Sequence, residues 1–249
     1  MKDLLDRLSP LTDVERYKDF MFFAIKGAQV EDPEVLEALT TLFMDIHQGS
    51  GGVWPVLRSE KSTLREKVCD WVRQRYLGAD VAALILYAPD GTPVEVVGAG
   101  GLKSLNRDSD ADLDYWNGGV VQAIQSRDDE RSTQLAFLNH SGLPLEVHKK
   151  DLSGGGWLIN PDKTAILQSG GISPRWRRKG LGRYLLHFRK KISHQLLQKT
   201  VLFNVIADTV ATTPAIALYE KERALFLGNH FDGQQLPRYN MQLYAFPLK

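Results

Sequence analysis

The chain has 249 residues, 43% of them hydrophobic and 24% charged, which fits a soluble globular protein with one large domain or two small ones. The formal net charge of +1 argues against a dedicated nucleic-acid binder, and the single cysteine, Cys69, excludes an internal disulfide and a cysteine-rich zinc site. We find no apolar run of about 18 residues and no apolar leader at the N-terminus, so we expect no membrane span, no signal peptide and a cytoplasmic location.

Residues 1–77 are predicted to be mainly helical. Apolar residues recur at helical spacing over 13–26, which predicts a first helix there. A second helix is expected to begin at Pro33, because Asp32 is a good N-cap and proline fits the first helical position. The spacing of apolar residues over 62–76 predicts a third helix.

A β-hairpin is predicted after these helices. Val81–Tyr87 is an apolar run typical of a buried strand, and residues 94–98 return after a turn that contains proline and glycine. Gly98–Gly101 superficially resembles a nucleotide-binding loop, but no periodic helix follows it. We therefore interpret these glycines as the bent end of a strand.

Residues 105–160 show the weakest secondary-structure pattern in the sequence. Aspartates alternate over 108–114, but the glycine and glutamate of a calcium loop are missing, which favours a solvated loop. A short helix is expected over 115–124. Trp157–Ile159 is expected to pair with the apolar residues 165–167 as a hairpin.

A strand, a basic glycine-spaced turn and a helix follow one another between Ile166 and Leu197. Pro174 ends the strand because proline has no N–H for the ladder. Apolar residues then recur every three or four positions from Leu181, which predicts a helix. Gly180 has no Cβ, so a phosphate group could approach the backbone N–H groups at the positive end of this helix.

Two more strands and a helix are predicted near the C-terminus. Thr200–Ala207 is an apolar run typical of a buried strand, and Asp208 closes it. Thr213 is expected to cap a helix whose first residue is Pro214. Residues 238–246 are expected to form the last strand.

These segments carry a family resemblance. Arg177–Gly182 fits the R/Q-x-x-G-x-G/A signature of the GNAT acyl-CoA N-acyltransferases, and Ile172–Pro174 is similar to the V-x-P that ends that family's fourth strand. Residues 212–221 resemble its N-x-x-A-x-x-L-Y-x-K segment, although Thr212 replaces the asparagine. The family's following G-F pair has its nearest counterpart at 228–231, which predicts a helix longer by about one turn.

The resemblance implies a single α/β domain over residues 1–249. Its sheet would be mixed and mostly antiparallel, flanked by helices, with two parallel strands that splay apart. Residues 1–77 would form a helical N-terminal part, 105–160 an insertion, and 157–249 the acyl-CoA-binding core.

The resemblance also implies a site. The donor would be acetyl-CoA or another acyl-CoA, without a metal, and the acceptor an amine on a small molecule or a protein. Tyr219 is the candidate general acid, and Asp208 or Glu95 the candidate general base. The implied cofactor-binding residues are Gly171, Ile172, Ser173, Arg177, Arg178, Lys179, Gly180, Leu181, Gly182, Arg183, Thr212, Ala215 and Tyr219.

Three questions stay open on the sequence. Residues 174–182 and 227–231 are similar to segments of bacterial arginine N-succinyltransferases, which favours succinyl transfer to an amino acid as an alternative to acetyl transfer. A non-catalytic CoA-binding or protein-interaction module with the same fold is the alternative class. A homodimer is neither required nor excluded, and no nucleic-acid or membrane partner is implied.

Overall fold

The structure is a computed structural model that describes residues 8–49, 61–105, 110–125, 133–134, 146–147, 159–209, 212–229 and 240–248. In these ranges eight strands follow the hydrogen-bonded order β1-β2-β3-β4-β7-β8-β10-β9, and β5 pairs with β6 separately. Neighbours β1–β2, β2–β3, β3–β4, β8–β10 and β9–β10 are antiparallel, whereas β7–β8 is parallel. The predicted mixed, mostly antiparallel α/β sheet is confirmed.

The chain divides by packing into two compact units. The first unit is Met1–Lys103 with Leu167–Ile192, and the second is Ser104–Ile166 with Ser193–Lys249. None of the helices in the described part of the chain has the length and apolar character needed to cross a bilayer.

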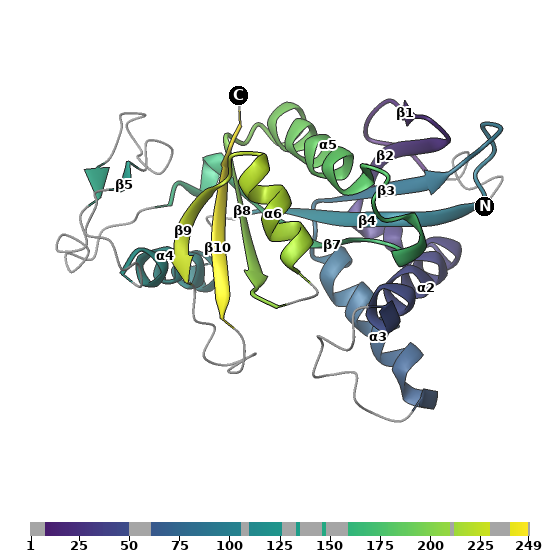
Figure 1. The fold of residues 1–249 in the computed structure, drawn as a ribbon, viewed down its shortest axis with the longest axis horizontal. Helices are drawn as coiled ribbons and strands as arrows, with labels where there is room; N and C mark the ends of the chain where they lie inside the picture. The colour runs from purple at the N-terminus through teal and green to yellow at the C-terminus, as the bar shows by residue number, and fades with distance from the viewer. Residues whose placement is uncertain are drawn as a thin grey trace. The chain divides into compact units, whose positions relative to one another are not determined.

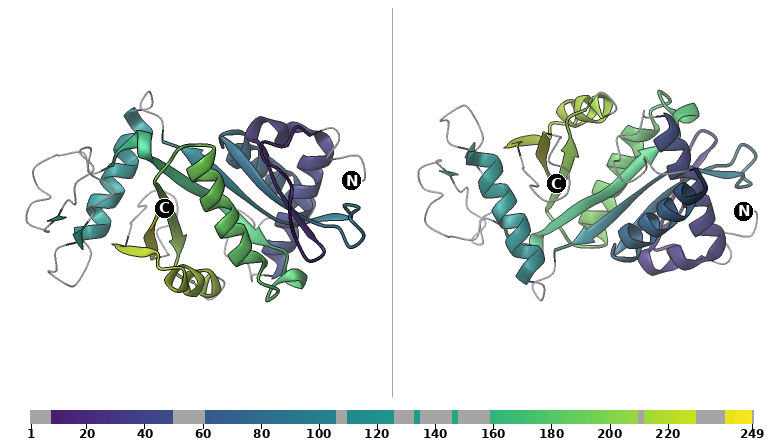
Figure 2. Two further views of the ribbon diagram at one scale, coloured as in Figure 1. Left: turned by 90° about the horizontal axis from the view of Figure 1, so that it is seen from above. Right: turned by 90° about the horizontal axis from the view of Figure 1, so that it is seen from below.

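The first unit is a sheet covered by helices on both faces (Figures 1 and 2). Its elements are β1 (Glu15–Tyr17), β2 (Phe20–Lys26), η1 (Gly27–Glu31), α2 (Pro33–Gly49), α3 (Lys61–Leu77), β3 (Val81–Tyr87), β4 (Glu95–Ser104), the end of β7 (Thr164–Ile172), η5 (Pro174–Trp176) and most of α5 (Leu181–Gln195). Helices α2 and α3 cover one face and α5 covers the other (Figure 2).

The first predicted helix is wrong, because residues 15–17 and 20–26 form the strands β1 and β2. Alternate residues of β2 face opposite helix layers, as strand geometry requires. Phe23 belongs to the buried cluster with α2 and α3, whereas the Phe22 ring lies 4.4 Å from that of Tyr184 in α5. A strand buried on both faces is apolar at nearly every position, so helical spacing also occurs in it by chance.

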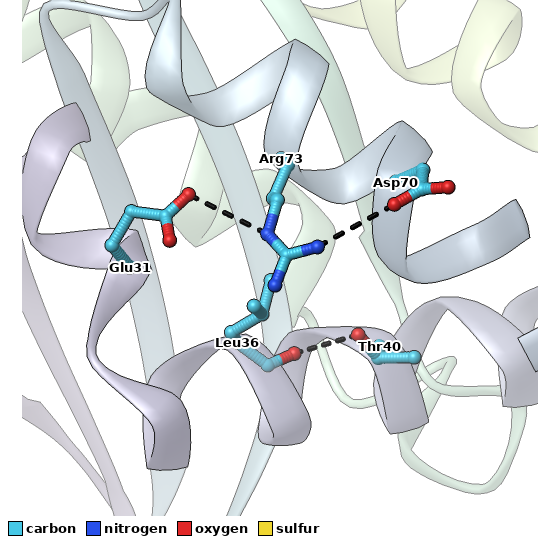
Figure 3. Close-up of polar contacts among 5 residues, drawn as sticks. All are labelled: Glu31, Leu36, Thr40, Asp70 and Arg73. Atoms are coloured by element: carbon cyan, nitrogen blue, oxygen red, sulfur yellow. Dashed lines mark hydrogen bonds and ion pairs between the residues drawn. The ribbon is translucent and has the colours of Figure 1, made fainter. Parts of the chain in front are cut away.

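Helices α2 and α3 confirm the second and third predicted helices. The Asp32 carboxylate accepts hydrogen bonds from the N–H groups of Glu34 and Val35 at 3.0 and 3.2 Å, as an N-cap does. Figure 3 shows that Arg73 of α3 lies between Asp70, at 3.4 Å, and Glu31 of η1, at 3.5 Å. The Thr40 hydroxyl donates to the Leu36 carbonyl within α2 at 2.7 Å (Figure 3).

The predicted β3–β4 hairpin is confirmed, but its second strand is longer than expected. Gly98–Gly101 lie inside β4 and do not form the bent end of a strand. The register shifts between Ile85 and Leu86 on the partner strand. A Cβ on Gly98 would lie 2.6 Å from Cδ1 of Ile172, and one on Gly100 would lie 2.6 Å from a guanidinium nitrogen of Arg189. These glycines therefore make room for close packing.

The second unit also has a sheet with helices on both faces. Its elements are the end of β4, α4 (Asp110–Gln125), β5 (Thr133–Gln134), β6 (Glu146–Val147), η4 (Pro161–Lys163), the start of β7, the end of α5, β8 (Val201–Ala207), α6 (Thr213–Lys221), β9 (Leu225–Asn229) and β10 (Met241–Pro247). In β10, Leu243 and Ala245 pack in one cluster with α4, whereas the rings of Tyr244 and Phe246 contact Tyr219 of α6.

One expectation for residues 105–160 is wrong. Residues 110–114 begin α4 and are not a loop, which agrees with the preference of acidic residues for a helix N-terminus; Asp108 lies outside the described residues. The expected hairpin partner of 165–167 falls mostly on Trp157 and Leu158, which also lie outside the described residues. Asn160 caps η4, with its side chain accepting from the Asp162 N–H at 3.1 Å.

Helix α6 starts and ends earlier than predicted. Thr212, not Thr213, is the N-cap residue, and the helix ends at Lys221 without the extra turn. Arg223 has φ 57°, and the Ala224 N–H donates to the Tyr219 carbonyl at 2.9 Å. This is the Schellman arrangement that closes a helix, so the chain turns directly into β9.

Candidate functional site

The turn between β7 and α5 has an unusual backbone. Arg178 has φ 62° and Gly180 has φ 83°, so two of the three residues before α5 are left-handed. The Tyr184 N–H donates to the Gly180 carbonyl at 3.1 Å, which is the first bond of the helix. Turns that alternate in this way aim successive N–H groups in one direction and form anion-binding concavities. A left-handed arginine is uncommon and marks the turn as a candidate site.

Trp176 fixes this turn to the sheet. Its ring centroid lies 5.4 Å from that of Phe20 in β2 and 4.5 Å from that of Tyr87 in β3. Lys179 Nζ lies 4.7 Å from the indole centroid, and Arg175 Cζ lies 5.6 Å from it. This anchoring role of Trp176 was not predicted from the sequence, although a tryptophan among four cations is itself a noticeable signal.

Cations surround the turn. The side chains of Arg177, Arg178 and Lys179 are exposed, and Arg177 Nε donates to the Ile172 carbonyl at 3.2 Å. Arg175 instead forms an ion pair with Glu95, the first residue of β4. The first unit therefore brings the candidate base Glu95 to the basic turn, but it holds that carboxylate against a guanidinium.

The end of β7 is held by β4 and α2. The Ser173 N–H donates to the Val97 carbonyl at 2.9 Å, and the buried Ser173 hydroxyl donates to the Asp45 carboxylate. A Cβ on Gly171 would lie 2.6 Å from Cδ1 of Ile46. Ser173 is one of the predicted cofactor residues, and its hydroxyl is bonded to Asp45 within the protein. Asp45 was missed because nothing near it in the sequence indicates this contact.

The candidate residues of the second unit lie on β8 and α6. Tyr219 is buried, and its phenol oxygen accepts a hydrogen bond from the Asn204 amide at 2.9 Å. The Thr212 hydroxyl donates to the Ala207 carbonyl and accepts from the Thr209 N–H at 3.0 Å.

Asp208 lies where β8 ends. It is exposed, and its carboxylate accepts from the Gln242 amide at 3.2 Å. Ala215 lies in the first turn of α6. Asp208, Thr212, Ala215 and Tyr219 thus belong to the second unit, while Glu95 and the residues from Gly171 to Arg183 belong to the first.

The parallel strand pair confirms one element of the expected architecture. Its register joins Thr164 to Val201, Ala165 to Leu202, and Ile166 to Phe203. Both strands continue past these pairs, β7 to Ile172 and β8 to Ala207. In the part of the chain that the structure describes, no three His, Cys, Asp or Glu side chains are grouped as metal ligands.

Comparisons with known proteins support the fold. No family model and no curated protein matches the sequence. The chain is similar to the solved structure of a ribosomal-protein-S5-alanine acetyltransferase from Vibrio fischeri, with 8% identity and a TM-score of 0.52 over 96% of this chain and 98% of that one.

Two other solved structures have TM-scores of 0.48. Arabidopsis thaliana NAA60 in complex with acetyl-CoA is 16% identical over 92% of this chain and 98% of that one. An acetyltransferase of the GNAT family from Bacillus anthracis is 10% identical over 94% and 98%. The mixed sheet and the likeness to the Vibrio fischeri enzyme show that this chain has the GNAT-like α/β fold that the sequence predicted.

Proposed function

We propose that the chain is an acyl-CoA-dependent N-acyltransferase whose donor is acetyl-CoA. The turn between β7 and α5 carries this proposal. Arg178 and Gly180 have positive φ, and α5 starts directly after them, so the N–H groups of its first turn have no acceptor within the helix. With Arg177 and Lys179 exposed beside it, this turn suits a pyrophosphate.

The proposed donor residues follow the family resemblance. Gly171, Ile172 and Ser173 would lie against the pantetheine arm, and the N–H groups of Gly180–Arg183 would bind the pyrophosphate. A backbone N–H near Gly171 would also polarise the thioester carbonyl as charge develops on its oxygen. In the second unit, Thr212, Ala215 and Tyr219 would contact the donor.

The proposed reaction is direct transfer. The neutral amine nitrogen attacks the thioester carbonyl carbon, a C–N bond forms, and the C–S bond breaks. The general base takes one proton from the attacking nitrogen, and the departing thiolate takes a proton from the Tyr219 phenol. The products are an amide and free CoA thiol.

Of the two candidate bases, Asp208 fits better than Glu95. The Glu95 carboxylate is engaged in an ion pair with the Arg175 guanidinium and would have to leave it to reach the attacking amine. Asp208 is exposed at the end of β8, and its described partner is a neutral amide. We therefore assign proton removal to Asp208 and place Glu95 in support of the basic turn.

A non-catalytic CoA-binding module is the alternative that one observation favours. Thr212 stands where the family has asparagine, and its hydroxyl is occupied by the Ala207 carbonyl and Thr209. A weakened pantetheine contact would lower donor affinity without removing the fold. The alternative acyl group is succinyl in place of acetyl.

We further propose that the protein acts in the cytoplasm. We also propose that residues 1–249 work together as one domain.

Thiol release separates these alternatives. The chain is mixed with acetyl-CoA or succinyl-CoA and with pools of amines, and free thiol is measured over time. An enzyme releases thiol only when both the acyl-CoA and a suitable amine are present. Saturable acyl-CoA binding without thiol release from any pool would favour the non-catalytic module.

A further inference from the structure

The C-terminal end of α2 places a carboxylate at the end of β7. Asp45 is exposed, and its Oδ2 accepts a hydrogen bond of 2.5 Å from the hydroxyl of Ser173, which is 5% exposed. Ser173 directly follows β7, and its N–H donates to the Val97 carbonyl of β4 at 2.9 Å. The donor that holds Asp45 is thus itself fixed by the sheet.

The next residue of α2 contacts the same strand end. A Cβ on Gly171 would lie 2.6 Å from Cδ1 of Ile46, so the helix approaches Gly171 as closely as a glycine permits. Two residues of extended chain span roughly 6–7 Å. Asp45 is bonded to Ser173, so its distance from the Gly171 backbone is comparable to the length of one long side chain.

Among the described ranges no lysine or arginine forms an ion pair with Asp45. The Arg177 guanidinium of the basic turn is instead bonded to the carbonyl of Ile172, the residue before Ser173, at 3.2 Å. Burial lowers the pKa of the neighbouring His47 to about 4, so that imidazole is neutral at pH 7. Asp45 lies just before the last turn of α2, near the end of the helix that carries partial negative charge and favours a cation. An acid without an ion-pair partner near the C-terminus of a helix departs from the usual preference, and such departures are typical of functional sites.

We propose that Asp45 binds an ammonium group of the acceptor, and that the acceptor is an amine that carries a second, protonated nitrogen. This inference rests on the proposed function, which places the thioester near Gly171. The attacking nitrogen must have lost its proton, so the ammonium group bound by Asp45 is a different nitrogen of the same molecule. Diamines and basic amino acids have this chemistry.

A matched pair of acceptors tests the inference. 1,4-Diaminobutane and butylamine have the same carbon chain and differ by one ammonium group. Loss of a charged hydrogen bond lowers binding affinity by roughly 10- to 100-fold. The wild-type chain should therefore show a kcat/KM for the diamine at least about 10-fold above that for butylamine. In Asp45→Asn this ratio should fall close to one, mainly through KM, while calorimetry gives an unchanged acetyl-CoA affinity.

Two further variants control the experiment. Glu37→Gln removes another exposed acid of α2, one that forms an ion pair with Arg65, and it should keep the wild-type ratio. Asp45→Glu keeps the charge and should retain part of the preference. An Asp45→Asn chain with the wild-type ratio would overturn the inference, as would a wild-type chain that binds acetyl-CoA but does not prefer the diamine. Failure of the wild-type chain to bind acetyl-CoA would overturn the proposed function itself.

Discussion

The amide of Asn204 in β8 donates a hydrogen bond of 2.9 Å to the phenol oxygen of Tyr219 in α6. The Tyr219 ring packs edge-on against Phe246 at 5.1 Å between centroids and contacts Tyr244 at 5.5 Å. The Asn204 bond uses the phenol oxygen as an acceptor and does not use the phenol proton. The orientation of Tyr219 is therefore set by three residues of two strands.

Replacing Tyr219 with phenylalanine keeps this packing and removes only the hydroxyl. We expect kcat to fall by about 10²- to 10⁴-fold, because the thiolate loses its acid, while acetyl-CoA affinity holds. The lost bond to Asn204 should cost about 0.5–1.5 kcal/mol of stability. Steady-state kinetics and urea unfolding measure the two effects. A variant that keeps most of its kcat would assign Tyr219 to packing alone.

Gly182→Glu tests the proposed pyrophosphate site. The new carboxylate would lie in the first turn of α5, where it repels an anion, yet acids are tolerated at a helix N-terminus and the fold should survive. We expect calorimetry to detect no acetyl-CoA binding by a chain with wild-type circular dichroism. Gly118→Glu in α4 is the matched control, since a Cβ there meets nothing within 4 Å. Unchanged affinity in folded Gly182→Glu would reject the site.

The two candidate bases are distinguished by their neutral variants. Asp208→Asn should lower kcat by about 10²- to 10⁴-fold, with acetyl-CoA affinity retained. Glu95→Gln should instead leave kcat within about two-fold of the wild-type value, because it breaks only an exposed ion pair with Arg175. The reverse pattern would transfer the role of base to Glu95.

Burial of His47 should make the free energy of unfolding depend on pH. It is 6% exposed, and burial lowers its pKa from 6.5 to about 4. Between pH 4 and pH 6.5 the unfolded chain binds the His47 proton more readily than the folded chain does. The contribution of neutral His47 to the free energy of unfolding is therefore complete above pH 6.5 and is lost as the pH falls toward 4. This loss is roughly 3 kcal/mol.

Urea unfolding at several pH values measures this contribution. His47→Gln cannot titrate, so its free energy of unfolding should decrease less than that of the wild-type chain between pH 6.5 and 4. The difference between the two curves isolates this group from the carboxylates that titrate in the same range. Parallel curves would show that His47 is accessible to protons in the folded state.

Local signals explain what the sequence could predict. Pro174 and the glycines of the basic turn mark the boundary between β7 and α5, and Asp32 with Pro33 marks the start of α2. Such signals depend on residues a few positions apart, so a single sequence contains them. The helix predicted over 13–26 failed because burial on both faces of β2 removes the polar positions that would distinguish a strand from a helix.

The missed site residues depend on contacts that are distant in the sequence. Asp45 and Ser173 are 128 positions apart, and their hydrogen bond follows from the packing of α2 against the end of β7. Trp176 anchors the basic turn through rings supplied by β2 and β3. No local pattern contains this information, so only the folded arrangement reveals these roles.

Acetyl transfer to an amine is the central claim, and one coupled measurement tests it most directly. The wild-type chain is incubated with acetyl-CoA and 1,4-diaminobutane, and free thiol is followed while mass spectrometry detects the acetylated amine. We predict that thiol and acetylated amine appear in equal amounts, at a rate that depends on the enzyme concentration and is lost in Gly182→Glu. Acetyl-CoA that stays intact with this and every other amine offered would contradict the claim.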